Sequence, residues 1–190
     1  MGSLAAKLGP SDDYVEQVAN YWQRVGAEFR NMPQIWTGAD VYQDGLPDAA
    51  PEIVARIVAD VDSPNYRLLR WLISAGATAI GTEDPVLLQE EYELLKASIA
   101  DEAARRAYAQ RAAGLLAERD RYIAGRIDEN LTGEGTGVLF IGLQHRVLQA
   151  LPADIKITSL RSCQELLPGL SRLVAGQRSG SRPGRDGPPA

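Results

Sequence analysis

The stretch that decides the fold is VLFIGLQH, residues 138–145. Its first four residues form a continuous apolar run, the pattern of a strand buried on both faces of a parallel sheet. Gly142 and His145 follow directly, so a polar loop begins where this strand ends. A buried parallel strand needs parallel neighbours and helices that cover both faces of the sheet. The stretch therefore predicts an α/β fold whose central strand leads into a loop suited to binding a ligand.

Helical and extended patterns alternate along the rest of the chain. Three further segments are typical of short strands: 39–42, 77–80 and 154–158, the last with the alternating pattern of a strand near an edge. Four segments have helical periodicity: 11–30, the stretches that begin at Pro51 and at Pro64, and 85–131, which we expect to break within 98–101. We predict a small, mainly parallel sheet of about four strands, flanked by helices and carrying one long helical segment.

The 190 residues divide into one domain and two tails. We expect residues 1–10 to be flexible and residues 11–175 to form a single α/β domain. Residues 176–190 read GQRSGSRPGRDGPPA, a composition that cannot bury enough apolar surface to offset the entropy of ordering. This segment is therefore predicted to be a disordered C-terminal tail.

Composition excludes several classes of function. The net charge of −5 is concentrated in the body of the chain, which argues against nucleic acid as a partner. The apolar runs are too short to cross a bilayer, so we expect no membrane partner. Cys163 is the only cysteine, which excludes an internal disulfide and favours a reducing, cytoplasmic location. The chain has no glycine-rich nucleotide-binding motif of the usual kinds.

Acidic residues and the only histidine follow three of the predicted strands. Asp44 lies after the first strand, Glu83 after the second and His145 after the central one. If these strands are parallel neighbours, the three side chains converge at one edge of the sheet. Two carboxylates and an imidazole are suitable ligands for a divalent metal such as Mn²⁺, Zn²⁺ or Co²⁺. The same three groups could instead serve as a base, an orienting acid and a group that positions water.

Each of these residues also has a purely structural interpretation. Asp44 precedes a glycine and is typical of a turn, and Glu83 lies where acidic residues stabilise the start of a helix. His145 could be a hydrogen-bonded turn residue. Gln43 and Gln144 lie in the same two loops and are further candidates for contacts with a substrate.

The segment 119–127, RDRYIAGRI, together with the strand and the Gly142–His145 motif, is similar to the closing part of the EreA/ChaN/TraB superfamily. The similarity covers about 40 residues, in which an arginine-bearing helix leads into an apolar strand and a GxxH motif. It implies a metal-dependent, hydrolase-like or ligand-binding α/β domain with His145 at its site. It also implies that Arg121 or Arg126 binds a carboxylate or another anion. The second histidine of the TraB branch is missing, and Asp44 and Glu83 would have to take its place.

Two hypotheses follow from the sequence. The first is a metal-assisted hydrolase that acts on a small or peptide-like substrate at the carboxyl ends of the strands. The alternative is a non-catalytic module of the same fold that binds a small ligand or a protein through the same edge. In either case the long helical segment, whose apolar residues lie within 90–131, could support a homodimer.

Overall fold

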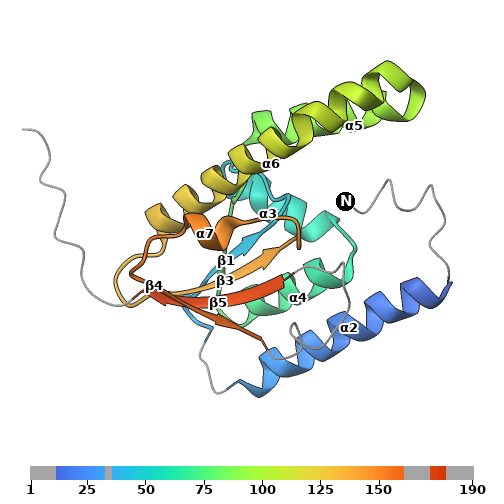
Figure 1. Ribbon diagram of the computed structural model, residues 1–190. Helices are drawn as coiled ribbons and strands as arrows, with labels where there is room; N and C mark the ends of the chain where they lie inside the picture. Colours follow the sequence, from blue (N-terminus) through green and yellow to red (C-terminus); the bar gives the residue numbers. More distant parts are fainter. Residues whose placement is uncertain (1–11, 33–35, 161–171, 179–190) are drawn as a thin grey trace, which may run out of the picture.

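The computed structural model describes residues 12–32, 36–160 and 172–178. Within these ranges the chain forms an α/β fold around a five-stranded sheet with strand order β2-β1-β3-β5-β4 (Figure 1). The strands are β1 (Asp40–Gln43), β2 (Thr78–Ile80), β3 (Thr136–Ile141), β4 (Ile155–Ser159) and β5 (Arg172–Arg178). The helices are α2 (Asp12–Asn31), α3 (Pro51–Asp60), α4 (Pro64–Ser74), α5 (Pro85–Ala100), α6 (Glu102–Asn130) and α7 (Val147–Ala150).

The parallel half of the sheet matches the prediction. Strand β1 pairs in parallel with β2 on one side and with β3 on the other, so that Val41 lies opposite both Ala79 and Val138. The four predicted strands all form within one or two residues of their expected limits, and β4 lies at an edge of the sheet as expected. The prediction of an α/β fold with parallel strands flanked by helices is confirmed for the three strands β2, β1 and β3.

The fifth strand was not predicted. Strand β5 lies between β3 and β4 and pairs antiparallel with both, with Leu173 opposite Phe140. Its last residues, 176–178, belong to the segment that the sequence predicted as a disordered tail, and this part of the prediction is wrong. The apolar run of β5, residues 173–175, is short, and its partner strand β3 is distant in sequence, so local patterns do not reveal the pairing. Residues 1–10, Cys163 and residues 179–190 lie outside the described ranges.

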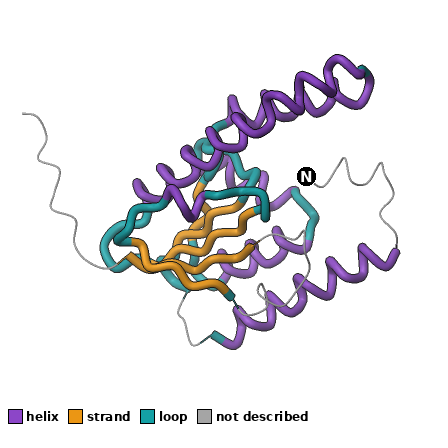
Figure 2. The backbone as a smooth tube through the Cα atoms, in the orientation of Figure 1, coloured by secondary structure: helices purple, strands orange, loops and turns teal. Residues whose placement is uncertain are grey.

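Alternating side chains of the central strands supply two hydrophobic cores. Val41, Val138 and Phe140 point to the face covered by α2, α3 and α4. Tyr42 and Leu139 point to the opposite face, where the second half of α6 and the short helix α7 pack. Figure 2 shows the sheet between these two helical layers. Because both faces are covered, the edge at which the parallel strands end is where the loops can carry polar groups.

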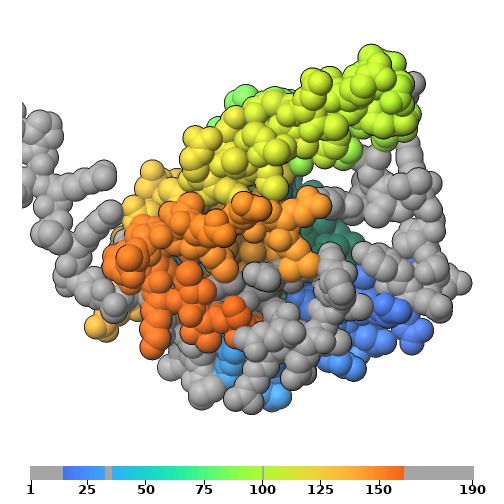
Figure 3. Space-filling model, viewed as in Figure 1, coloured from blue at the N-terminus to red at the C-terminus, as the bar shows by residue number. Residues whose placement is uncertain are grey.

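The long helical segment breaks where the sequence predicts. Asp101 separates α5 from α6, and its carboxylate accepts hydrogen bonds from the amides of Ala103 and Ala104 at 3.2 and 3.1 Å. Helix α5 and the first half of α6 form a hairpin that extends beyond the sheet (Figure 3). Arg111 links its two helices through ion pairs with Glu90 and Glu118. Only the second half of α6 covers the sheet, and a homodimer formed through this segment stays a prediction.

Among the residues that the structure describes, no helix is both long enough and apolar enough to span a bilayer.

Gly81, at the end of β2, brings two loops into backbone contact. A Cβ atom at Gly81 would lie 2.6 Å from both Asp48 Cα and Pro47 O. We therefore expect Gly81→Ala to lower the free energy of unfolding by about 1–3 kcal/mol, because backbone atoms must move apart. Gly125→Ala is a matched control, since a Cβ atom there meets nothing within 4 Å on an exposed part of α6.

Gly125→Ala should raise the free energy of unfolding by about 0.5–1 kcal/mol, because alanine favours a helix more than glycine does. Urea denaturation of both variants measures the difference. Equal stabilities for the two variants would show that the loops after β1 and β2 do not approach each other at Gly81.

Candidate functional site

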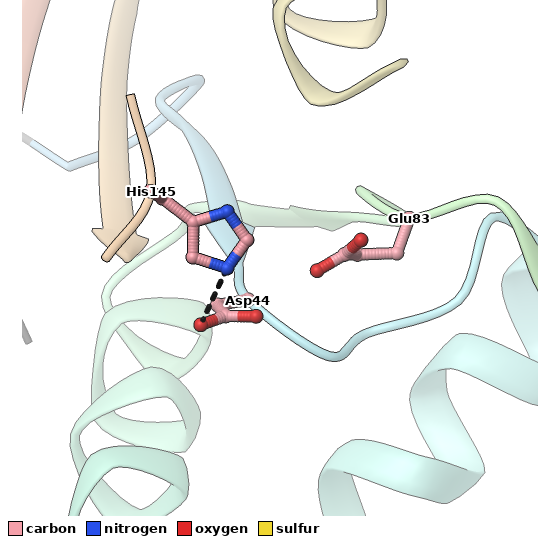
Figure 4. A group of neighbouring side chains, drawn as sticks. All are labelled: Asp44, Glu83 and His145. Atoms are coloured by element: carbon pink, nitrogen blue, oxygen red, sulfur yellow. Dashed lines mark ion pairs between the residues drawn. The ribbon is translucent and has the colours of Figure 1, made fainter. Parts of the chain in front are cut away.

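The three residues predicted to converge lie together at the carboxyl edge of the parallel strands. Asp44 directly follows β1, while Glu83 and His145 lie in the loops after β2 and β3. Strand β1 lies between the other two, so its loop is adjacent to both of theirs. One potential ligand atom from each side chain lies within 4.8 Å of those of the other two. Figure 4 shows the carboxylate of Glu83 directed toward the Asp44–His145 pair.

Two glycines allow the loops to close around these side chains. Gly45 has a φ of +80°, and its amide donates a hydrogen bond to Glu83 Oε1 at 3.1 Å. The amide of Gly142 donates to Asp44 Oδ2 at 3.1 Å. A Cβ atom at Gly142 would lie 3.0 Å from that oxygen and 3.4 Å from His145 Cδ2. The glycine of the Gly142–His145 motif is therefore needed for the close approach of β3 to Asp44.

The buried guanidinium of Arg119, on α6, joins the carboxylates to one another. It donates through Nε and Nη2 to both oxygens of Glu83, at 2.9 and 2.5 Å. Nη2 also donates to Asp44 Oδ1 at 2.9 Å, and Nη1 donates to Glu91 on α5 at 2.6 Å. Glu83 is fully buried, and a bidentate pair of this kind is a strong charge-assisted contact. Arg119 thus fixes the loops after β1 and β2 to the helix above them.

A second α6 residue, Asp120, orients the imidazole. Its Oδ1 lies 2.6 Å from His145 Nδ1, and its Oδ2 accepts a hydrogen bond from the amide of Arg146 at 2.7 Å. The other ring nitrogen, Nε2, faces Asp44 Oδ2 at 3.5 Å, the contact drawn in Figure 4. His145 is therefore held between two carboxylates, one on each ring nitrogen.

The pKa shifts follow from burial and from these partners. Burial alone would lower the pKa of His145, but its contacts with Asp44 and Asp120 outweigh burial and raise it. Burial tends to raise the pKa of Asp44, and the hydrogen bond and charge of His145, with the charge of Arg119, reverse this and lower it. Burial raises the pKa of Glu83, although Arg119 opposes the shift.

The cluster has more acidic than basic groups. Four carboxylates, those of Asp44, Glu83, Glu91 and Asp120, face the guanidinium of Arg119 and the imidazole of His145. When the acids are ionised, at least two negative charges remain uncompensated, even with a protonated histidine. A partly buried excess of negative charge favours the binding of a cation.

The other predicted site residues lie outside this cluster. Arg121 is exposed and donates to Ala117 O of its own helix. Arg126 pairs with Asp48 at 3.0 Å and with Glu129 at 3.2 Å. The structure thus brings neither of these arginines to the three converging side chains, and their role in binding an anion stays a prediction.

The two glutamines differ from each other. Gln43 is buried, donates through Nε2 to Asp44 O and accepts through Oε1 from Asn65, so its contacts support the loop after β1. Gln144 is exposed in the loop after β3, next to the imidazole in sequence. Contacts of either side chain with a substrate stay predictions.

Arg119 and Asp120 are site residues that the sequence patterns did not single out. Both belong to the segment that carries the superfamily resemblance, which implied an anion-binding role for the later residues Arg121 or Arg126. Helical periodicity is the signal that distinguishes them. Arg119 lies four residues from both Leu115 and Ile123, which are buried, whereas Arg121 lies off this stripe. A charged residue on the buried stripe of a helix needs a charged partner, and the converging acids provide it.

Loss of the Arg119 side chain should destabilise the fold strongly. In Arg119→Met the buried carboxylate of Glu83 loses its counter-charge, so we expect the free energy of unfolding to fall by about 3–5 kcal/mol. Replacing both residues, as in Arg119→Met/Glu83→Leu, should recover part of that loss, since no unpaired charge of Glu83 remains.

Arg121→Met is the matched control for this prediction. It removes an exposed guanidinium from the same helix and should change stability by less than about 0.5 kcal/mol. Urea denaturation at neutral pH compares the three variants. The ion-pair assignment would be wrong if Arg119→Met and Arg121→Met unfolded at the same urea concentration.

The raised pKa of His145 predicts a pH dependence of stability. The folded chain binds this proton more tightly than the unfolded chain, whose histidine has the ordinary pKa of about 6.5. The contribution of the protonated His145 to the free energy of unfolding is therefore complete below about pH 6.5. It is lost as the pH rises through the folded pKa. We expect the stability difference between the native chain and His145→Gln to shrink as the pH rises from about 6 through the raised folded pKa. Denaturant midpoints across that range measure it, and parallel pH profiles would contradict the prediction.

Comparisons of the chain with family models, with curated proteins and with solved structures find no match. The similarity to the EreA/ChaN/TraB superfamily therefore rests on the sequence pattern alone and stays a prediction. The fold and the geometry of the site are what a function has to be argued from.

Proposed function

We propose that Asp44, Glu83 and His145 form a divalent-cation site that assists the hydrolysis of a small or peptide-like substrate. The observation that carries this proposal is the orientation of the imidazole. Asp120 occupies Nδ1 of His145, so that Nε2 faces Asp44 Oδ2 across 3.5 Å. A carboxylate that hydrogen-bonds one ring nitrogen while the other faces the site is the usual arrangement of a metal-binding histidine.

The spacing of the donor atoms fits a metal ion in part. Ligand bonds of about 2.0–2.2 Å at tetrahedral angles place neighbouring ligand atoms about 3.4 Å apart. The separation of 3.5 Å between His145 Nε2 and Asp44 Oδ2 is close to that value. Glu83 fits less well, because both of its oxygens already accept hydrogen bonds from Arg119. Asp44 and His145 would therefore be the primary ligands, and Glu83 would share its carboxylate with the guanidinium.

The residues of the chain suggest a division of roles. A bound cation would polarise a substrate carbonyl and lower the pKa of water at the site. Arg119 holds the two carboxylates in place, and the amide of Gly142 fixes the orientation of Asp44. The exposed loop residues next to the imidazole, Leu143 and Gln144, would contact the substrate. The class of substrate comes from the superfamily resemblance.

A specific observation favours the alternative, a non-catalytic binding module. The guanidinium of Arg119 pairs with Glu83, Asp44 and Glu91 at once. It thereby supplies a buried positive charge at the place where a metal ion would otherwise be needed. A chain that uses its own cation in this way could keep the fold and bind a ligand or a protein without a metal.

Thermal unfolding with added cations distinguishes the two functions. With Mn²⁺, Zn²⁺ or Co²⁺ at about 100 times Kd, the folded state of the native chain should gain about 2.7 kcal/mol over the chelator-treated sample. His145→Ala should lose that gain, because the imidazole is a primary ligand. The protein should be free of affinity tags, since His145 is the only histidine in the chain.

Cys163→Ser controls for metal binding by the only thiol. It should keep the rise in unfolding temperature, whereas a rise caused by the thiol would disappear in Cys163→Ser and persist in His145→Ala. A hydrolase should also cleave members of an ester and peptide panel, and chelator and His145→Ala should both abolish the cleavage. A native chain that no cation stabilises would exclude the metal-assisted hydrolase and leave the binding module.

A further inference from the structure

The carboxylate of Asp120 is buried, and each of its oxygens contacts the loop that carries His145. Oδ1 lies 2.6 Å from His145 Nδ1, and Oδ2 accepts from the amide of Arg146 at 2.7 Å. The same loop is closed by a hydrogen bond from the amide of His145 to Gly142 O at 3.1 Å. The backbone and the ring of this histidine are therefore fixed by separate contacts.

We propose that Asp120 is a positioning residue that holds the neutral imidazole of His145 with its proton on Nδ1 and the lone pair of Nε2 directed at the cation site. The proposal rests on the proposed function, because it assigns Nε2 as the atom that binds the cation. Asp120 does not itself touch the cation or the substrate. It acts through the histidine and the loop that carries it.

The protons that each group can donate determine the tautomer of the imidazole. An ionised carboxylate only accepts hydrogen bonds, so the contact between Asp120 Oδ1 and Nδ1 requires the proton to be on Nδ1. A neutral imidazole has one N–H, and the proton on Nδ1 therefore leaves Nε2 as an acceptor. Nε2 is the nitrogen that faces Asp44 Oδ2, where the excess negative charge of the cluster attracts a cation. The tautomer set by Asp120 is the one that can bind a metal ion.

The contact with Arg146 makes the effect of a single substitution predictable. A backbone N–H can only donate, so in Asp120→Asn the amide carbonyl must turn toward Arg146 and accept from it. The NH₂ group of the asparagine then faces Nδ1, which must become an acceptor. The proton of the neutral imidazole moves to Nε2, where it blocks the cation. The substitution preserves the shape of the side chain and reverses the tautomer.

Nitrogen NMR of the metal-free full chain reads the tautomer directly. With ¹⁵N-labelled histidine, the only imidazole in the chain gives a single pair of ring signals. At a pH where the ring is neutral, we expect the Nδ1–H form in the native chain and the Nε2–H form in Asp120→Asn. Cation binding, followed by thermal unfolding with Zn²⁺ alone, should weaken by about 10- to 100-fold in Asp120→Asn. Glu129→Gln, which removes an exposed carboxylate from the same helix, should change neither reading.

Each outcome decides between distinct claims. An Nε2–H form in the native chain would overturn the proposal, and this reading does not depend on any variant folding. An Nδ1–H form that persists in a folded Asp120→Asn would overturn it as well. The expected reversal of tautomer without any stabilisation of the native chain by Zn²⁺ would uphold the positioning role and reject the cation site. In that case the proposed function fails while the orientation of His145 stands.

Discussion

The bidentate ion pair between Arg119 and Glu83 is the interaction on which the rest of this site depends. Glu83 has no exposed surface, and a carboxylate in that environment is stable only with a counter-charge and hydrogen bonds. Arg119 supplies both and reaches Asp44 and Glu91 as well. The guanidinium thereby connects the loops after β1 and β2 to the helices α5 and α6. These contacts of Arg119, together with the apolar packing of Ile123 and Ile127 against the sheet, hold α6 in place and with it Asp120 beside His145.

Sequence patterns predicted most of this fold because the parallel half of the sheet obeys local rules. Residues 138–141 are apolar on both faces since two helical layers cover them, and Asp101 caps α6 where the long helical segment had to break. Strand β5 was not predicted for two reasons. It pairs antiparallel with β3, which is distant in the sequence, and its last residues have the same polar composition as the tail that follows.

The part of the candidate site that lies at the ends of parallel strands was also predictable from local rules. Asp44, Glu83 and His145 follow strand ends, and strand ends of a parallel sheet meet at one edge whatever the loops contain. Arg119 and Asp120 lie within a long helix, so their role depends on the rotation of α6 about its axis. The buried stripe through Leu115 and Ile123 indicates that rotation. Site residues that follow strand ends can thus be predicted from the sequence more easily than site residues on a helix.

The cluster holds more negative charge than the pairing of Arg119 with Glu83 accounts for. Neutralising Glu83 requires one positive charge, and Arg119 provides it. Placing Asp44 and Asp120 on either side of His145 adds further negative charge, which His145 and Arg119 compensate only in part. Clusters of interacting ionisable groups with shifted pKa values are concentrated at functional sites. A cation held by Asp44 and His145 would compensate part of the remaining negative charge while leaving the Arg119–Glu83 pair intact. The excess of negative charge around the imidazole is therefore the feature of this structure that favours a cationic ligand. It carries more weight than the convergence of three side chains.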